Sequence, residues 1–217
     1  MRQNIGIYGG TFNPIHIGHL VAAQDTIERH RLDSLFWVPS ARPPHKRCAG
    51  LAPAEDRCAM IVAAIAGAPR MAVCRWEIER GGRSYTVDTV RRFRAEFPRA
   101  NLFFLIGADS LYELHTWREI GAILDLCRMV TVTRPGFAIR RSRIRLPAAT
   151  VARLMADRVQ SHEIGISSTE IRRRLAAGRP IRYLVPDAVE ALIRERGLYR
   201  AGRARDDGPT PRAAKRH

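Results

Sequence analysis

Lysine is nearly absent from this chain of 217 residues, and arginine supplies almost all of its positive charge. Only Lys46 and Lys215 occur, whereas the formal net charge is +16. Such a charge is one mark of a nucleic-acid-binding protein, but the arginines are spread over the whole chain, and no RNA-binding module with stacking aromatic residues is recognisable. Arginine-rich codon usage produces the same skew, and a basic field helps to gather anionic substrates such as a triphosphate. Nucleic-acid binding is therefore kept only as a remote alternative.

The four cysteines form no recognisable pattern, and long apolar runs are missing. Cys48, Cys58, Cys74 and Cys127 are scattered, with no CxxC pair and no histidine at ligand spacing, which argues against a zinc site and for reduced thiols. No apolar run is long enough to span a bilayer. The first residues enter a predicted strand and lack the apolar stretch of a signal peptide. We therefore expect a cytoplasmic protein with no membrane partner and no metal site of its own.

Segments typical of strands and of helices alternate along the chain. This order predicts an α/β fold, a Rossmann-like open parallel sheet flanked by helices on both faces. We expect a single domain over residues 1–200, followed by a disordered basic tail at 201–217 that is rich in Arg, Pro, Gly and Asp. The expected strands are 5–8, 35–38, 71–74, 102–106 and 129–133, and the expected helices are 20–30, 54–66, 86–97, 117–124, 148–156, 169–177 and 187–196.

The segment GGTFNPIHIGH at residues 9–19 follows the first predicted strand. Gly9 and Gly10 lack a Cβ, so we expect a sharp turn that a ligand can approach closely. A helix expected to start near Gly18 points its unpaired N–H groups and the positive end of its dipole at that turn, which suits a phosphate chain. His16 and His19, three residues apart at the helix start, are placed to aim at the same anion. The segment therefore predicts a nucleotide-phosphate site.

Polar motifs also follow later strands, and such a fold gathers them at one edge of the sheet. His45 and Lys46 end a loop that is stiffened by two prolines, and its place after the second strand favours contact with a phosphate. Thr86 lies at the start of a predicted helix, where hydroxyl and N–H groups are available to an anion.

The fourth predicted strand is followed by a motif suited to a base and its sugar. The turn at Gly107 lets a flat base approach the backbone, and Asp109 can accept hydrogen bonds from ribose hydroxyls. The indole of Trp117 could stack on an aromatic ring, although a single tryptophan is more often part of the core.

A last motif, ISSTEIR at residues 166–172, has the features of a capped helix start. Ser167 and Glu170 have the spacing of a capping box. The additional hydroxyl groups and Arg172 make this helix start a second cradle for phosphate, which we expect opposite the first.

Together these segments resemble the bacterial nicotinate-nucleotide adenylyltransferase family over residues 5–199. GGTFNPIHIGH and ISSTEIR are typical of the adenylyltransferase superfamily that shares its fold with class I aminoacyl-tRNA synthetases, and PPHK, RSYTVDT, GADS, LHTW and RPG are typical of this member. The resemblance implies an enzyme of NAD biosynthesis that makes nicotinate adenine dinucleotide and pyrophosphate from ATP and nicotinate mononucleotide. It leaves open whether the protein is a monomer or a homo-oligomer.

The resemblance also implies roles for the matching residues. His16, His19 and Arg172 are the expected catalytic residues, and the two histidines would hold the ATP phosphates and the transition state. The chain departs from the family pattern at Asn13, where Asp is frequent, and at Ser40, where Asn is frequent. The expected mononucleotide-binding residues are His45, Lys46, Tyr85, Thr86, Trp117 and Arg118, and the expected ATP-binding residues are Gly9, Gly10, Thr11, Phe12 and Gly18 in the first motif, Gly107 and Asp109 at the adenosine, Arg134 near the phosphates, and Ser167 and Ser168 at the departing pyrophosphate.

The implied nucleophile is a nucleotide phosphate, which is already ionised at neutral pH, so neither a general base nor a covalent intermediate is needed. It attacks the α-phosphorus of ATP in line, and fixed donors meet the growing charge. Mg²⁺ is expected to arrive with ATP, since it prefers phosphates and water. The alternative is a sister adenylyl- or cytidylyltransferase acting on another small phosphate, such as pantetheine phosphate. A class I aminoacyl-tRNA synthetase is excluded, because the chain is too short and lacks a KMSKS segment.

Overall fold

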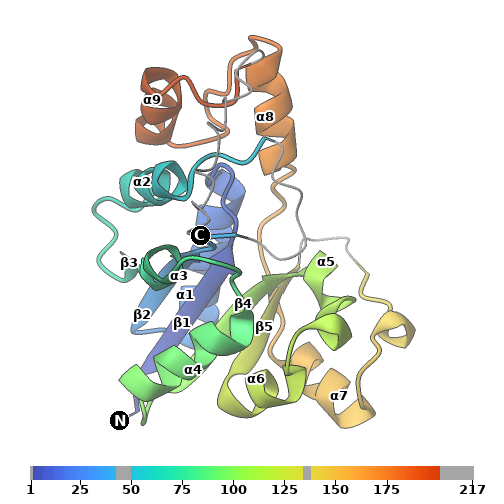
Figure 1. Ribbon diagram of the computed structural model, residues 1–217. Helices are drawn as coiled ribbons and strands as arrows, with labels where there is room; N and C mark the ends of the chain where they lie inside the picture. The colour runs from blue at the N-terminus through green and yellow to red at the C-terminus, as the bar shows by residue number, and fades with distance from the viewer. Residues whose placement is uncertain (1, 43–49, 134–137, 201–217) are drawn as a thin grey trace, which may run out of the picture.

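Six parallel strands form one open sheet in the computed structural model, which describes residues 2–42, 50–133 and 138–200 (Figure 1). The strand order is β3-β2-β1-β4-β5-β6, and every neighbouring pair is parallel. This is the order of a doubly wound, dinucleotide-binding sheet, which confirms the predicted fold class. The strands are β1 (Asn4–Gly10), β2 (Ser34–Pro39), β3 (Met71–Val73), β4 (Asn101–Gly107), β5 (Arg128–Thr133) and β6 (Val159–Gln160).

Helices cover both faces of the sheet, and each face has its own apolar core. One core packs α1, α2, α8 and α9 against the strands, and the other packs α4, α6 and α7 against the opposite face. In β4, Phe103 and Leu105 belong to the first core, whereas Leu102, Phe104 and Ile106 belong to the second, as the two-residue period of a strand requires. The helices are α1 (Ile17–His30), α2 (Ala54–Ala64), α3 (Trp76–Arg80), α4 (Thr86–Glu96), α5 (Ala108–Leu111), α6 (Ile120–Leu126), α7 (Ala148–Ala156), α8 (Ser168–Ala176) and α9 (Asp187–Glu195), with 3₁₀ turns η1 (Leu114–Thr116) and η2 (Arg141–Arg143).

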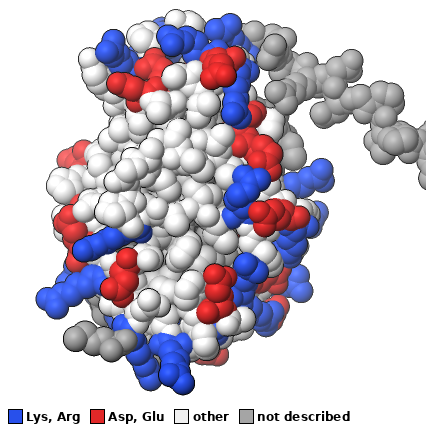
Figure 2. All heavy atoms as spheres, turned by 90° about the vertical axis from the view of Figure 1, so that its left-hand side faces the viewer, with Lys and Arg blue, Asp and Glu red and all other residues white. Residues whose placement is uncertain are grey.

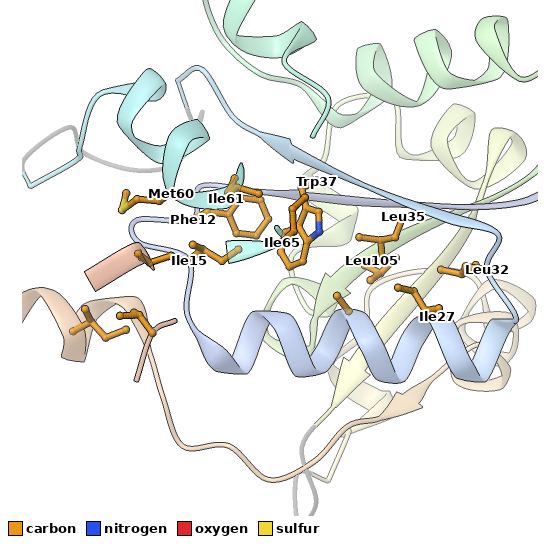
Figure 3. Close-up of a cluster of buried hydrophobic side chains, with 14 of the residues drawn as sticks. Phe12, Ile15, Ile27, Leu32, Leu35, Trp37, Met60, Ile61, Ile65 and Leu105 are labelled. Atoms are coloured by element: carbon orange, nitrogen blue, oxygen red, sulfur yellow. The ribbon is translucent and has the colours of Figure 1, made fainter. Parts of the chain in front are cut away.

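Apolar side chains of the first motif anchor the loop after β1 in the first core (Figure 3). Phe12 and Ile15 are 3% and 0% exposed, and they belong to the same cluster as Met60 and Ile61 of α2. Full burial of side chains of this size is worth about 1.5–3 kcal/mol each. The core itself therefore holds this loop at the end of the sheet.

Most predicted elements are present, with ends that differ by a few residues. The sequence does not predict β6, α3 or α5, because elements this short carry no measurable hydrophobic period. The helix predicted over 117–124 is wrong at its start. Trp117 has an extended backbone with φ of −72° and ψ of 136°, and Glu119 has a positive φ of 51°, so that α6 begins only at Ile120. The predicted tail lies outside the described residues, and no helix in the described ranges is long and apolar enough to cross a membrane.

The positive charge is not gathered into a single patch on the face that Figure 2 shows. Arginine side chains alternate there with acidic side chains around a broad uncharged area. Several arginines of the described residues form ion pairs, such as those of Arg75 with Glu55 and of Arg196 with Asp56. This arrangement supports the interpretation of the arginine content as dispersed charge.

Candidate active site

A cavity of about 300 Å³ opens where the chain leaves β1 and β4. These strands are neighbours, but the chain continues from β1 to β2 on one side and from β4 to β5 on the other. Ligands of doubly wound sheets bind in the crevice at such a switch point. The predicted site residues that line the cavity are Gly9, Gly10, Thr11, Tyr85, Thr86, Gly107, Trp117 and Arg118.

The two glycines of the first motif do not form the predicted sharp turn. Gly9 and Gly10 are the last residues of β1. A Cβ at Gly9 would lie 2.8 Å from the ring of Phe104, and a Cβ at Gly10 would lie 2.8 Å from the ring of Phe12. The glycines therefore leave room for two aromatic rings. The turn comes at Phe12, whose φ of 47° is uncommon for a bulky residue and needs strong support from the surrounding structure.

The imidazole rings of His16 and His19 are stacked at the start of α1, with centroids 3.7 Å apart and planes inclined by 28°. The backbone N–H of His16, which is the N-cap residue, donates to Nδ1 of His19 over 3.3 Å. A neutral imidazole that accepts at Nδ1 carries its proton on Nε2. His19 also lies edge-on to Tyr8, with ring centroids 6.2 Å apart, and Tyr8 lines the cavity. Neither histidine lines the cavity itself, but His19 contacts Tyr8 of its wall, and the pair lies at the positive end of α1.

Gly18 makes this stacking possible. A Cβ at this position would lie 3.2 Å from Cε1 and Nδ1 of His16 and 3.5 Å from Cγ2 of Ile164. Contacts within the protein itself therefore explain why the motif has glycine at this position.

Replacing Gly18 with alanine should disturb catalysis without unfolding the protein. The added methyl group displaces the His16 ring by a few tenths of an ångström or more, and we expect kcat to fall about tenfold, because small errors in placing catalytic groups are costly. Alanine is favoured over glycine in helices by up to about 1 kcal/mol, so the melting temperature should not fall. Gly121→Ala, where a Cβ meets nothing within 4 Å, is the matched control. Identical kinetics of the two variants would contradict this assignment.

The second predicted cradle contacts the loop of the first. Ser167 is the N-cap of α8, and its hydroxyl accepts the backbone N–H three residues further on, over 3.1 Å, which confirms that part of the predicted cap. Ser168 Oγ donates to the carbonyl of Pro14, and Nη1 of Arg172 donates to the carbonyl of Asn13, each over 2.8 Å. The N-termini of α1 and α8 therefore meet at one loop, an arrangement suited to a chain of phosphates.

Asn13, one of the two departures from the family pattern, is a buried connecting residue. Its Nδ2 donates to the carbonyl of Gly50 over 2.9 Å. Its Oδ1 accepts the N–H of Ala52 and the hydroxyl of Tyr199, over 3.0 and 2.7 Å. Burial raises the pKa of the Tyr199 phenol, so that this hydroxyl stays protonated and donates. A carboxylate at this position could not donate to Gly50, so the amide suits these three contacts.

Aromatic side chains and a helix start lie together in the cavity wall. Trp117 is half-buried and lies edge-on to Phe104, with centroids 6.3 Å apart and planes at 87°. The guanidinium of Arg118 lies 5.0 Å from the centroid of the Tyr85 ring, and Thr86 is the first residue of α4. The cavity thus offers apolar ring surface together with the N–H groups of a helix start, which is what a flat ring with an anionic substituent requires.

Glu77 lines the cavity as well, although the sequence analysis does not predict it. Its side chain is 6% exposed and accepts a hydrogen bond from Oγ1 of Thr89. Burial raises the pKa of the Glu77 carboxyl, and hydrogen bonds from Ser84 and Thr89 oppose the rise. Because charged residues are usually exposed, a sequence pattern predicts them at the surface, and no local signal distinguishes Glu77 from its exposed neighbour Glu79.

The remaining predicted residues are outside the cavity wall or outside the described part of the chain. Asp109 is exposed in the first turn of α5, directly after β4. His45, Lys46 and Arg134 lie outside the described residues. Within the described ranges, no three or more His, Cys, Asp or Glu side chains are grouped so that they could hold a metal ion.

Comparison with known proteins places the chain in a family. The profile of the cytidylyltransferase-like family matches residues 7–174. The chain is 46% identical over 200 residues to a probable nicotinate-nucleotide adenylyltransferase of Moorella thermoacetica, covering 90% of this chain and 91% of that relative. The chain belongs to the nicotinate-nucleotide adenylyltransferase family. A Thermus thermophilus relative with the same name is also 46% identical, over 198 residues that make up 91% of this chain and 100% of the relative.

Solved structures share the fold of this family at much lower identity. The nicotinic acid mononucleotide adenylyltransferase of Plasmodium falciparum complexed with APC superposes with a TM-score of 0.72 at 18% identity, covering 91% of this chain and 98% of the other. The same protein complexed with NaAD gives a TM-score of 0.70. These likenesses concern the fold, and they agree with the sheet described above.

Proposed function

We propose that this chain transfers the AMP part of ATP to nicotinate mononucleotide, giving nicotinate adenine dinucleotide and pyrophosphate, a step of NAD biosynthesis. The observation that carries this proposal is one cavity at the switch point, lined by Trp117 and Thr86 and adjoining the histidine pair. The family of the chain supports the same activity. The free thiols of Cys58 and Cys127 favour a cytoplasmic location.

The two halves of the site would receive the two substrates. The pyridine ring would lie against the indole of Trp117, and its carboxylate would accept N–H groups near Thr86 and Arg118. The triphosphate would lie along the starts of α1 and α8, where Arg172 is already held by the carbonyl of Asn13. This arrangement brings the 5′-phosphate of the mononucleotide towards the α-phosphorus of ATP, as an in-line displacement requires.

Catalysis in this proposal comes from fixed donors. The 5′-phosphate is already ionised, so that no side chain has to remove a proton from it. As the bond to pyrophosphate breaks, negative charge grows on the phosphate oxygens next to the Nε2–H of His19 and the N-terminus of α1, which stabilise it. Mg²⁺ would enter with ATP as part of the substrate and neutralise charge on the phosphates.

A single coupled assay tests the activity and separates it from a sister transferase. Pyrophosphate release with MgATP should be rapid with nicotinate mononucleotide and at least tenfold slower with pantetheine phosphate, because only the former has a flat ring for Trp117 and a carboxylate for the start of α4. Nicotinamide mononucleotide in the same panel measures the preference for the acid over the amide. CTP in place of ATP is the control for the transferred nucleotide. A preference for pantetheine phosphate, or no turnover with nicotinate mononucleotide, would overturn the proposal.

A further inference from the structure

Arg57 is a fully buried cation in α2 that neither the motifs nor the mechanism accounts for. Its side chain is 0% exposed. Nε donates to the carbonyl of Ala52 over 3.0 Å, and Nη1 donates to the carbonyl of Thr11 over 2.8 Å. Nη2 donates to the carbonyls of Ser40 and Ala41 over 2.7 and 3.2 Å. These four partners are neutral carbonyl groups. The guanidinium is therefore used to join backbone segments rather than to pair with a carboxylate.

Two of the joined residues belong to the wall of the cavity. Thr11 follows β1, Ser40 follows β2, and both line the cavity. The backbone also joins these ends, because the N–H of Ser40 donates to the carbonyl of Gly10 over 2.9 Å. Arg57 thus joins two loops, each of which contributes a residue to the cavity wall.

The loop after β2 is also held from its other side. The hydroxyl of Ser84 accepts the N–H of Ala41 over 3.0 Å, and the N–H of Ser84 donates to the carbonyl of Arg42 over 3.2 Å. Ser84 directly precedes Tyr85 and Thr86, which line the cavity. Residues 40–42 therefore lie between Arg57 on one side and the segment that would receive the nicotinate ring on the other.

We propose that Arg57 is a positioning residue for the transfer reaction, which with Ser84 fixes residues 40–42 and Thr11 as one wall of the substrate cavity. The inference rests on the proposed function. A guanidinium is needed because its planar fork directs several N–H groups at carbonyls in different directions, whereas lysine donates from a single atom. Arg57→Lys keeps the charge but loses the simultaneous contacts, and so it separates geometry from electrostatics.

Arg94 provides a matched control. It also donates to backbone carbonyls, those of Pro98, Ala100 and Leu126 over 3.2, 2.8 and 2.8 Å, but at the opposite end of the sheet, next to the starts of β4 and β5. Arg57→Lys and Arg94→Lys should both lower the melting temperature. At a temperature well below both transitions, we expect Arg57→Lys to raise the KM for nicotinate mononucleotide about tenfold, with a smaller fall in kcat, and Arg94→Lys to keep both values within about twofold of wild type.

The wild-type protein in the same assay keeps the two proposals apart, since the proposed function is judged on the wild-type activity and the positioning role on the variants. An active wild type with unchanged KM in Arg57→Lys overturns the positioning role, as does an equal loss of activity in both variants. If Arg57→Lys shows no cooperative melting transition, Ser84→Ala tests the same wall from its other side. A KM raised severalfold in Ser84→Ala supports the placement of residues 40–42 as the cause, and an unchanged KM overturns it.

Discussion

Replacing either histidine of the first motif should lower kcat at least about a hundredfold. His16→Ala and His19→Ala each remove one ring of the stacked pair, and loss of one preorganised donor to a transition state typically costs this much. The KM values should change far less, because the charge that the pair stabilises develops only during transfer. Steady-state kinetics of pyrophosphate release with both substrates varied checks the prediction.

Melting curves are needed beside these kinetics, since the two histidines differ in burial. His16 is 5% exposed, so that His16→Ala should also lower the melting temperature modestly, whereas the effect for the more exposed His19 should be small. His30→Ala is the control within the same helix. His30 lies at the far end of α1, where Nε2 contacts the carbonyl of Asp157, and its loss should leave kcat unchanged. Near wild-type turnover in a folded His19→Ala protein would remove the central claim about this motif.

Trp117→Ala should specifically weaken binding of nicotinate mononucleotide. Stacking of aromatic rings is worth about 0.5–1.5 kcal/mol beyond burial, and lost burial adds to it. At about 1.4 kcal/mol per decade, the KM for nicotinate mononucleotide should rise roughly ten- to a hundredfold, with the KM for ATP almost unchanged. Trp117→Phe, which keeps a ring, should give a KM for nicotinate mononucleotide between those of the wild type and Trp117→Ala. Arg118→Lys should raise this KM far less than Trp117→Ala does.

The contact of Trp117 with Phe104 raises the alternative that the indole serves only to pack against the core. The indole is packed partly against the second core, so that its removal also lowers the melting temperature. If packing is its whole role, both KM values rise together, and the phenylalanine variant recovers stability and both substrates in parallel. An equal effect on ATP and on the mononucleotide would therefore refute the stacking assignment.

The parallel sheet could be predicted because the buried strands carry strong local patterns, whereas its strand order is seen only in the structure. β1 and β4 are apolar segments followed by polar motifs, and parallel strands place such motifs at one edge. Local pattern failed where tertiary contacts decide the backbone. The apolar spacing after Trp117 indicates a helix, but Glu119 adopts a positive φ and is held by Arg91 of α4, so that Trp117 stays extended beside the cavity.

The site was predictable wherever a residue acts through its own motif, and not where it acts through the backbone of distant segments. Thr86 was predicted from its place at a helix start and Trp117 from the family resemblance, and both line the cavity. Arg57 was missed because its four partners are carbonyl groups, which any sequence provides. One signal was available: Arg57 lies three and four residues before Met60 and Ile61, on the buried stripe of α2, where an unpaired charge is costly and therefore needs a purpose.

The contacts of Tyr199 and Asn13 have a consequence for the order of synthesis. Asn13 is synthesised early, but the hydroxyl that donates a hydrogen bond to it belongs to Tyr199, 186 positions later. The N–H of Ile17, at the start of α1, donates to the carbonyl of Leu184 over 3.1 Å. A nascent chain on the ribosome can therefore form most of the sheet, yet it cannot complete the contacts of Asn13 and of the start of α1 until the segment that contains α9 has emerged.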